Sequence, residues 1–217
     1  MEARRSFRVP PVGDSDYNRV RLLMVNRGWG RKADVNQSHD PGDYRFCPLC
    51  ATVLESRLDG TRRRLYCPRC GFVYYHNPVP AAGGVICRNG RVCLVRRAID
   101  PRRGFWSLPA GFMEYNEAPR ECARREIGEE TGLDVAIDDV LGVYSGFDDP
   151  RQHAVLIVYW VHELAVRTPV AGDDADAIDF FSPEAVPANI AFRAHRDALA
   201  DAFRSARFAG SPYDEGR

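Results

Sequence analysis

The chain has 217 residues, of which 45% are hydrophobic and 28% are charged, and its formal net charge is zero. This length allows one ordinary domain plus a small extra one. The balanced charge gives no overall field toward nucleic acid or an anionic membrane, and no apolar run is long enough for a transmembrane helix. The N-terminus, MEARRSFRV, lacks the apolar core of a secretory signal, so we expect a cytoplasmic protein.

Residues 1–44 are rich in proline, glycine and charge and have few apolar anchors. We predict a mostly disordered extension there.

Residues 45–76 contain two C-x-x-C pairs that are separated by residues 51–66. Two such pairs at this spacing predict a tetrahedral four-thiolate zinc site, with iron in the same cage as the alternative. The site would be structural, because a segment with so few apolar residues needs a metal in order to fold. Arg62, Arg63 and Arg64 lie between the pairs, where a solvated loop is expected and a nucleic-acid contact is the alternative. The four predicted zinc ligands are Cys47, Cys50, Cys67 and Cys70.

A second domain is predicted over residues 77–210 and begins with a β-hairpin. Residues 82–87 and 92–96 are strand-like and flank Asn89-Gly90, a strong two-residue hairpin signal. In that register Cys87 lies opposite Val92, which puts Cys87 and Cys93 on opposite faces of the hairpin. No disulfide between them is expected.

Residues 117–131 are predicted to form a helix. Asn116 is a good N-cap, Pro119 suits the first turn, and Gly132 suits the left-handed residue that ends a helix.

Three carboxylates, those of Glu126, Glu129 and Glu130, share one face of this predicted helix. Like charges at this spacing destabilise a helix unless a cation neutralises them, and Mg²⁺ or Mn²⁺ is the natural partner for oxygen ligands. Arg125 lies four residues before Glu129 and could hold its carboxylate. Glu117 could orient the metal ligands without binding the metal itself. A solvated charged helix face is the alternative.

The whole segment from Gly111 to Leu133 matches G-x5-E-x7-R-E-U-x-E-E-x-G-U, where U is an aliphatic residue. In this it resembles the Nudix hydrolases, and the preceding FWSLPA resembles that family's W-x-L-P-G-G approach, with Ala110 in place of a glycine. The resemblance implies an α/β fold, namely an α/β/α sandwich around a mixed sheet. It also implies that Glu126, Glu129 and Glu130 bind Mg²⁺ or Mn²⁺ together with the Ala110 carbonyl, and that Glu126 can double as a base.

After this segment, strands are expected over 140–144, 154–161 and 178–181, with an acidic loop over 172–176. The resemblance implies that a carboxylate from this loop joins the metal site or acts as base; we choose Asp174, with a solvated loop as the alternative. A final helix is expected over 189–208, with Phe192, Leu199 and Phe203 on one stripe. His195 lies on the same stripe and is expected to be a hydrogen-bonded packing residue, with a ligand role as the alternative.

The segment LPAGFME, residues 108–114, resembles the FAD and ADP-ribose pyrophosphatases of bacteria and plastids. The expected substrate is therefore a nucleoside diphosphate linked to another moiety, with ADP-ribose or FAD favoured. Zinc-ribbon relatives that cleave NADH or remove NAD caps from RNA carry an S-Q-P-W-P-F-P motif, which is absent from residues 137–146. A nucleic-acid-binding regulator is the alternative of another class, but its metal-binding segment would be degraded. The resemblance allows a homodimer.

Overall fold

The structure is a computed structural model that describes residues 44–209. The predicted extension over residues 1–44 therefore lies outside the described residues, apart from Tyr44. Within the described part, no helix is long and apolar enough to cross a membrane.

The cysteine-rich segment folds into a three-stranded antiparallel sheet in the order β1-β2-β3. The strands are β1 Glu55–Asp59, β2 Arg62–Tyr66 and β3 Val73–Tyr74. Here the loop prediction for Arg62, Arg63 and Arg64 is wrong, because the tight turn at Gly60 returns the chain into β2 at once. The small core contains only Cys47, Leu54 and Cys67 as buried residues, so the cysteines themselves form most of it.

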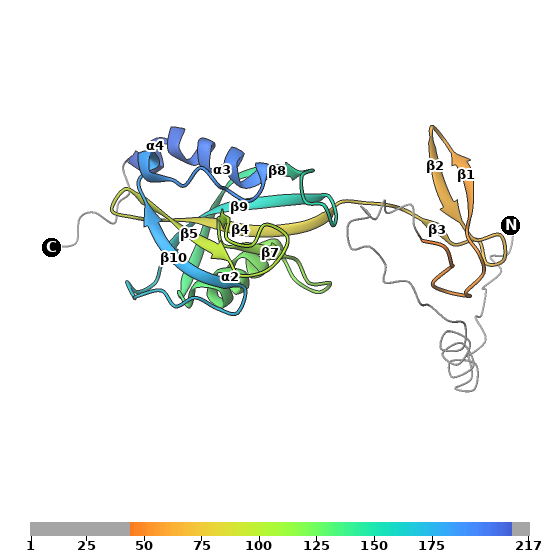
Figure 1. The fold of residues 1–217 in the computed structure, drawn as a ribbon, viewed down its shortest axis with the longest axis horizontal. Coiled ribbons are helices and arrows are strands. Elements are labelled where there is room, and N and C mark those ends of the chain that lie inside the picture. Colours follow the sequence, from red (N-terminus) through yellow and green to blue (C-terminus); the bar gives the residue numbers. More distant parts are fainter. Residues whose placement is uncertain (1–43, 210–217) are drawn as a thin grey trace, which may run out of the picture. The chain divides into compact units, whose positions relative to one another are not determined.

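The larger domain is built on one mixed sheet, as predicted from the family resemblance (Figure 1). The five long strands follow the order β10-β5-β4-β9-β8, with β6 paired to β5 and β7 to β4. Only the β4–β9 pair is parallel. The elements are β4 Val79–Arg88, β5 Arg91–Arg97, β6 Trp106–Ser107, β7 Ala110–Phe112, α2 Pro119–Thr131, β8 Val135–Gly146, β9 Ala154–Glu163, β10 Ala175–Phe181, the 3-10 turn Pro183–Ala185, α3 Arg193–Arg204 and α4 Ala206–Ala209.

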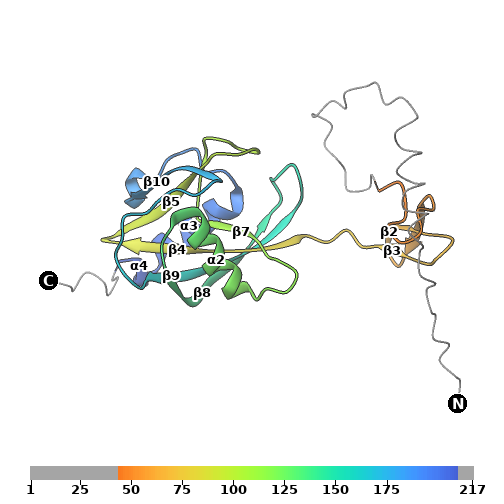
Figure 2. The same cartoon turned by 90° about the horizontal axis from the view of Figure 1, so that it is seen from below.

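Helices α2 and α3 cover opposite faces of this sheet, which Figures 1 and 2 show from two directions. Ile127 of α2 belongs to one buried cluster, with Ile86 and Cys93, while Leu199 of α3 belongs to the other. The period of two along a strand explains this division, since alternate side chains of β4 and β5 enter opposite clusters. Two cores therefore hold the site-bearing helix and the C-terminal helix in separate layers.

The predicted hairpin at Asn89-Gly90 is confirmed. Both residues have positive φ, 51° and 67°, as a two-residue hairpin turn of this kind requires. Cys87 pairs with Val92 in the strand register, and Cys87 and Cys93 pack against different clusters. The prediction that these two cysteines do not bridge is correct, because they face opposite sides of the sheet.

The predicted helix boundaries need correction at their N-terminal ends. Helix α2 begins at Pro119 with Ala118 as its N-cap, not Asn116, and Glu121 accepts the Ala118 backbone N–H at 2.9 Å. At its other end Gly132 has φ 67°, as predicted. Helix α3 begins at Arg193 instead of residue 189, because Asn189 to Ala191 bond to the backbone of Trp106 in extended form.

The same predicted helix ends early, because α3 stops at Arg204, where Ser205 leaves the helical conformation. The short helix α4 follows. The strands are longer than predicted: β8 covers twelve residues, and β10 begins at Ala175 within the stretch predicted to be an acidic loop. Pairing to a neighbouring strand extends these elements beyond their apolar residues.

Candidate active site

The site is built where strand β7 passes beneath helix α2. Gly111 lies directly under the Glu126 side chain, and a Cβ at Gly111 would lie only 2.1 Å from Cδ of Glu126. Only glycine allows this approach of a strand backbone to a helix carboxylate. The glycine that opens the sequence pattern thus leaves room for the Glu126 carboxylate in its observed position.

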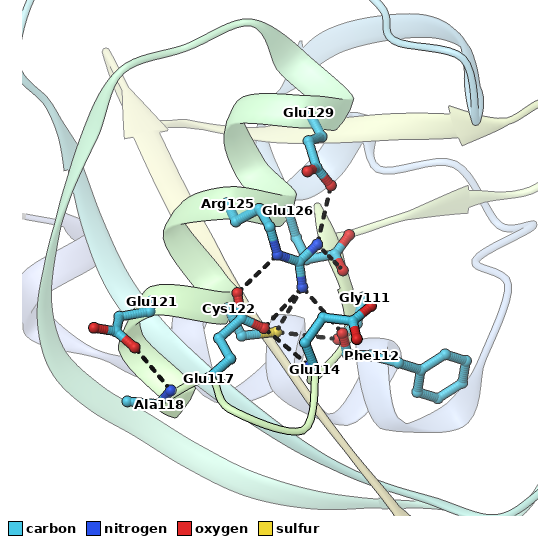
Figure 3. A network of polar contacts seen from close by, with 10 residues as sticks. All are labelled: Gly111, Phe112, Glu114, Glu117, Ala118, Glu121, Cys122, Arg125, Glu126 and Glu129. Carbon is cyan, nitrogen blue, oxygen red and sulfur yellow. Dashed lines mark hydrogen bonds and ion pairs between the residues drawn. The ribbon is translucent and has the colours of Figure 1, made fainter.

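Arg125 is the centre of a polar network on α2 (Figure 3). Its guanidinium donates to both oxygens of Glu117 at 2.7 and 2.8 Å, to Glu126 at 2.8 Å and to Glu129 at 3.0 Å. It also donates to the Phe112 carbonyl of β7 at 3.1 Å. The hydrogen bonds from Arg125 lower the pKa of Glu117 to about 2, so Glu117 is ionised and fixes the arginine.

Glu130, the last of the three carboxylates along α2, is half-buried. Its Oε2 accepts the backbone N–H of Ala110 at 3.0 Å, which links α2 to β7 a second time. Burial raises the pKa of Glu130 to about 8, against the opposing effects of the Ala110 hydrogen bond and of Arg97. Burial likewise raises the pKa of Glu126, although Arg125 acts in the opposite direction. Two half-buried carboxylates whose pKa values are raised favour the arrival of a cation.

The three predicted metal ligands share one helix face but point to different partners. Glu129 accepts a hydrogen bond from Arg125, while Glu130 accepts one from the Ala110 backbone N–H. Among residues 44–209 only the four cysteines have ligand atoms that all lie within 4.8 Å of one another. The donors are nevertheless hard oxygens, which suit Mg²⁺ or Mn²⁺. The assignment of Glu126, Glu129, Glu130 and the Ala110 carbonyl as ligands stays a prediction.

The acidic segment before β10 lies against the C-terminal end of α2. The Gly172 N–H donates to the Glu130 carbonyl at 3.2 Å, and Val170 donates to that of Thr131 at 2.8 Å. Asp174 follows in the turn, with an exposed side chain, and its charge contributes to the raised pKa of Glu130. The predicted loop carboxylate is thus within electrostatic range of the site, and its role stays a prediction.

A cavity of about 90 Å³ lies beside Ala110 and involves residues that we did not predict to be functional. Its walls come from β4, β5, β7, the segment after β8, β9 and the first turn of α3. No local pattern could have found these residues, because they are far apart in the chain. The polar and aromatic residues of its wall are Arg97, Phe112, Asp148, Asp149, Arg151, Phe192 and His195.

His195 departs from its prediction in one respect. It is buried and packs beside Phe192, as a packing histidine should, but its Nδ1 has no hydrogen-bond partner within the described residues. Trp106 packs edge-on against Phe181 at the core.

The four cysteines of the first module form a second candidate metal centre. Sulfur–sulfur distances are 3.5 Å for Cys47–Cys70 and 3.4 Å for Cys50–Cys67. A tetrahedral zinc site with ordinary zinc–sulfur bonds needs roughly 3.8 Å between sulfurs, so this cluster is close to the required size. The other three cysteines, Cys87, Cys93 and Cys122, belong to the larger domain and are at least partly buried.

Replacing Arg125 with lysine tests the network of Figure 3. A lysine keeps the charge but lacks the planar fork that holds both oxygens of Glu117. We expect kcat to fall by roughly 10- to 100-fold, as for other residues that orient metal ligands. Steady-state kinetics at saturating Mg²⁺ would measure this. Arg124→Lys on the same helix is the control, because Arg124 pairs only with exposed Asp134; equal rates for both variants would contradict the role of Arg125.

The chain is similar in sequence to a known protein family and to several named enzymes. The family model of the NUDIX domain matches residues 77–202. An ADP-ribose pyrophosphatase of Methanocaldococcus jannaschii is 39% identical over 114 residues, which cover 52% of this chain and 67% of that protein. The NAD-capped RNA hydrolase NudC of Chromobacterium violaceum is 42% identical over 92 residues, covering 42% of this chain. This chain spans only 34% of that hydrolase and 56% of its Pseudomonas aeruginosa counterparts.

Solved structures share the fold. A NUDIX hydrolase from Nitrosomonas europaea superposes with a TM-score of 0.66 at 31% identity, covering 78% of this chain and 93% of that one. A MutT NUDIX hydrolase from Burkholderia pseudomallei superposes with a TM-score of 0.51 at 30% identity, covering 58% of this chain and 98% of that one.

Proposed function

This chain belongs to the Nudix hydrolase family, and on that basis we propose that it cleaves the pyrophosphate bond of a nucleoside diphosphate linked to another moiety. The observation that carries this proposal is the network in which Arg125 holds Glu117, Glu126 and Glu129 above β7. A purely solvated helix face would not need a glycine beneath it or a buried carboxylate at its end.

In this proposal Glu126, Glu129, Glu130 and the Ala110 carbonyl hold Mg²⁺ or Mn²⁺. When bound, the cation neutralises the anionic pyrophosphate and lowers the pKa of an attacking water. Arg125 and Glu117 orient the ligands. Arg97, in the wall of the neighbouring cavity, adds a positive charge that interacts with Glu130. Glu126 or Asp174 takes the proton from water.

The cysteine cluster is proposed to hold Zn²⁺ in a structural role, because four thiolates close a tetrahedral site and leave no open position. A set of reduced thiols suits a reducing compartment, which supports the expected cytoplasmic location. Dimer formation stays a prediction.

ADP-ribose or FAD is the favoured substrate. The name of the M. jannaschii relative supports ADP-ribose, and LPAGFME supports both. NAD-derived substrates, NADH or an NAD-capped RNA, form the second candidate, because several relatives are NAD-capped RNA hydrolases. The S-Q-P-W-P-F-P motif is absent from residues 137–146, which ranks this candidate second. The intact metal-binding segment argues against a nucleic-acid-binding regulator.

The test is a product-resolved screen with Mg²⁺ or Mn²⁺ over ADP-ribose, FAD, NADH, NAD, dinucleoside polyphosphates and nucleoside triphosphates. We expect ADP-ribose or FAD to be cleaved with water into two monophosphates, at a kcat/KM at least about tenfold above that for NADH, a difference of roughly 1.4 kcal/mol in transition-state stabilisation. A tenfold preference for NADH would establish the second candidate instead. No turnover from folded, zinc-containing protein would favour the regulator or a capped RNA.

A further inference from the structure

The wall of the cavity beside Ala110 contains two buried polar atoms that have no hydrogen-bond partner among residues 44–209, Nδ1 of His195 and Oδ1 of Asp148. Such atoms are rare in folded proteins, because burial removes their hydrogen bonds to water without replacing them. Two of them in the wall of one cavity leave hydrogen-bonding capacity that a polar molecule entering the cavity can use.

Asp148 is held firmly by its other oxygen. Oδ2 accepts the backbone N–H of Arg193 at 2.9 Å, at the start of α3, and faces the Arg196 guanidinium at 3.5 Å. The carboxylate therefore cannot turn to satisfy Oδ1 without losing these contacts. His195, in the first turn of the same helix, is buried, and burial lowers its pKa to about 4, so its ring is neutral. The cavity thus offers a fixed acceptor beside a neutral imidazole nitrogen, which donates or accepts according to its tautomer.

Arg97 and Arg151 bring positive charge to the wall of this cavity. The Arg97 side chain donates through Nε to the Pro101 carbonyl at 2.9 Å, and its guanidinium lies 5.3 Å from the centre of the Phe192 ring. Within residues 44–209 no carboxylate is in ion-pair contact with Arg97. Arg151, by contrast, is neutralised by Asp149 through hydrogen bonds of 2.7 and 3.1 Å. The guanidinium of Arg97 can therefore bind an anionic group of a ligand that lies beside the carboxylates of α2.

The size of the cavity limits what can enter it. Its volume of about 90 Å³ is below the roughly 150 Å³ of a cavity that holds benzene, so a purine does not fit inside without rearrangement. One edge of a five-membered sugar is smaller and carries neighbouring hydroxyls. One hydroxyl can donate to Asp148 while the other pairs with His195 in either direction.

We propose that Asp148 and His195 hydrogen-bond two neighbouring hydroxyls of a ribose that is joined to the cleaved pyrophosphate, and that they select for this sugar. The proposal rests on the proposed function, because the phosphates must lie between Arg97 and the carboxylates of α2. Both the adenosine ribose and the terminal ribose of ADP-ribose carry such a diol.

The experiment compares full-length wild-type protein with Asp148→Asn and His195→Phe. Asparagine keeps the acceptor for Arg193 but can replace Oδ1 with an amide donor, and phenylalanine keeps the ring that packs on Phe192. Asp197→Asn is the control, because this exposed residue of α3 pairs only with Arg193. The substrates are ADP-ribose and two deoxy analogues, one lacking the 2-hydroxyl of the adenosine ribose and the other that of the terminal ribose. A fourth substrate is the inosine counterpart, in which the base amine is absent.

We expect wild-type kcat/KM to fall roughly 10- to 100-fold on one of the deoxy analogues, which identifies the bound ribose. Both variants should lose a similar factor on ADP-ribose but little further activity on that same analogue. The control should behave as wild type.

If the variants lose equal activity on every substrate, or discriminate only against the inosine compound, the sugar assignment is overturned while the hydrolase function stands. If wild type cleaves neither these compounds nor FAD or NADH, the proposed function fails. The cavity is then tested by calorimetry with ribose 5-phosphate and AMP, where binding that Asp148→Asn does not weaken overturns the inference.

Discussion

Replacing Glu129 with glutamine should lower kcat by roughly 10³-fold, because it weakens binding of a catalytic cation that contributes several kcal/mol to stabilising the transition state. Glutamine keeps the size and one acceptor oxygen but removes the charge that a divalent cation needs. Glu129 is suited to this test because its side chain is 59% exposed and its one direct partner is Arg125. The fold should therefore survive the change.

The measurement is steady-state turnover of the best substrate over a titration of Mg²⁺ or Mn²⁺, with thermal unfolding as the check on folding. Glu121→Gln is the matched control, since Glu121 lies on the same helix and serves only to cap it through Ala118. Glu130→Gln should give a loss as large as Glu129→Gln. Near-wild-type rates for either variant would show that these carboxylates do not hold the catalytic cation.

Replacing Cys47 with serine should abolish zinc binding and unfold residues 45–76. Metal binding in such small modules contributes about 10–16 kcal/mol at neutral pH, far more than the few buried residues here can supply. Cys47 is itself one of only three buried residues in this core. The larger domain has its own two core clusters and should remain folded.

Metal analysis of the purified variant and limited proteolysis would measure this, with the expected result of no zinc and cleavage within the first module. Cys87→Ser is the control, because Cys87 lies on β4, outside the cluster, and should leave the zinc content unchanged. Full zinc occupancy in Cys47→Ser would contradict the four-thiolate site.

Local patterns were sufficient to locate the elements whose signals are short in range. Asn89-Gly90 predicted its hairpin, because positive φ at two successive residues is a property of the turn itself. Gly132 likewise marked the end of α2. The spacing of Glu126, Glu129 and Glu130 placed them on one helix face for the same reason, since the helical period depends on the backbone alone.

Boundaries that depend on other parts of the chain were predicted less well. Asn116 is a good capping residue, yet Ala118 caps α2, because the loop from β7 determines where the helix begins. Residues 189–191 have a helical pattern but bond to β6, whose position no local pattern reveals.

The sequence by itself was enough to predict the chemistry proposed for this protein, because the carboxylates, the arginine that bonds to them and the four thiols all lie in short motifs. Only the tertiary structure decided what surrounds that chemistry. Asp148 and His195 come from different elements and carry no motif, and they share a cavity with Arg97 because β5, the segment after β8 and α3 meet there. The proposed selection of a ribose depends on these neighbouring side chains, which are brought together by packing across the sheet and not by spacing along the chain.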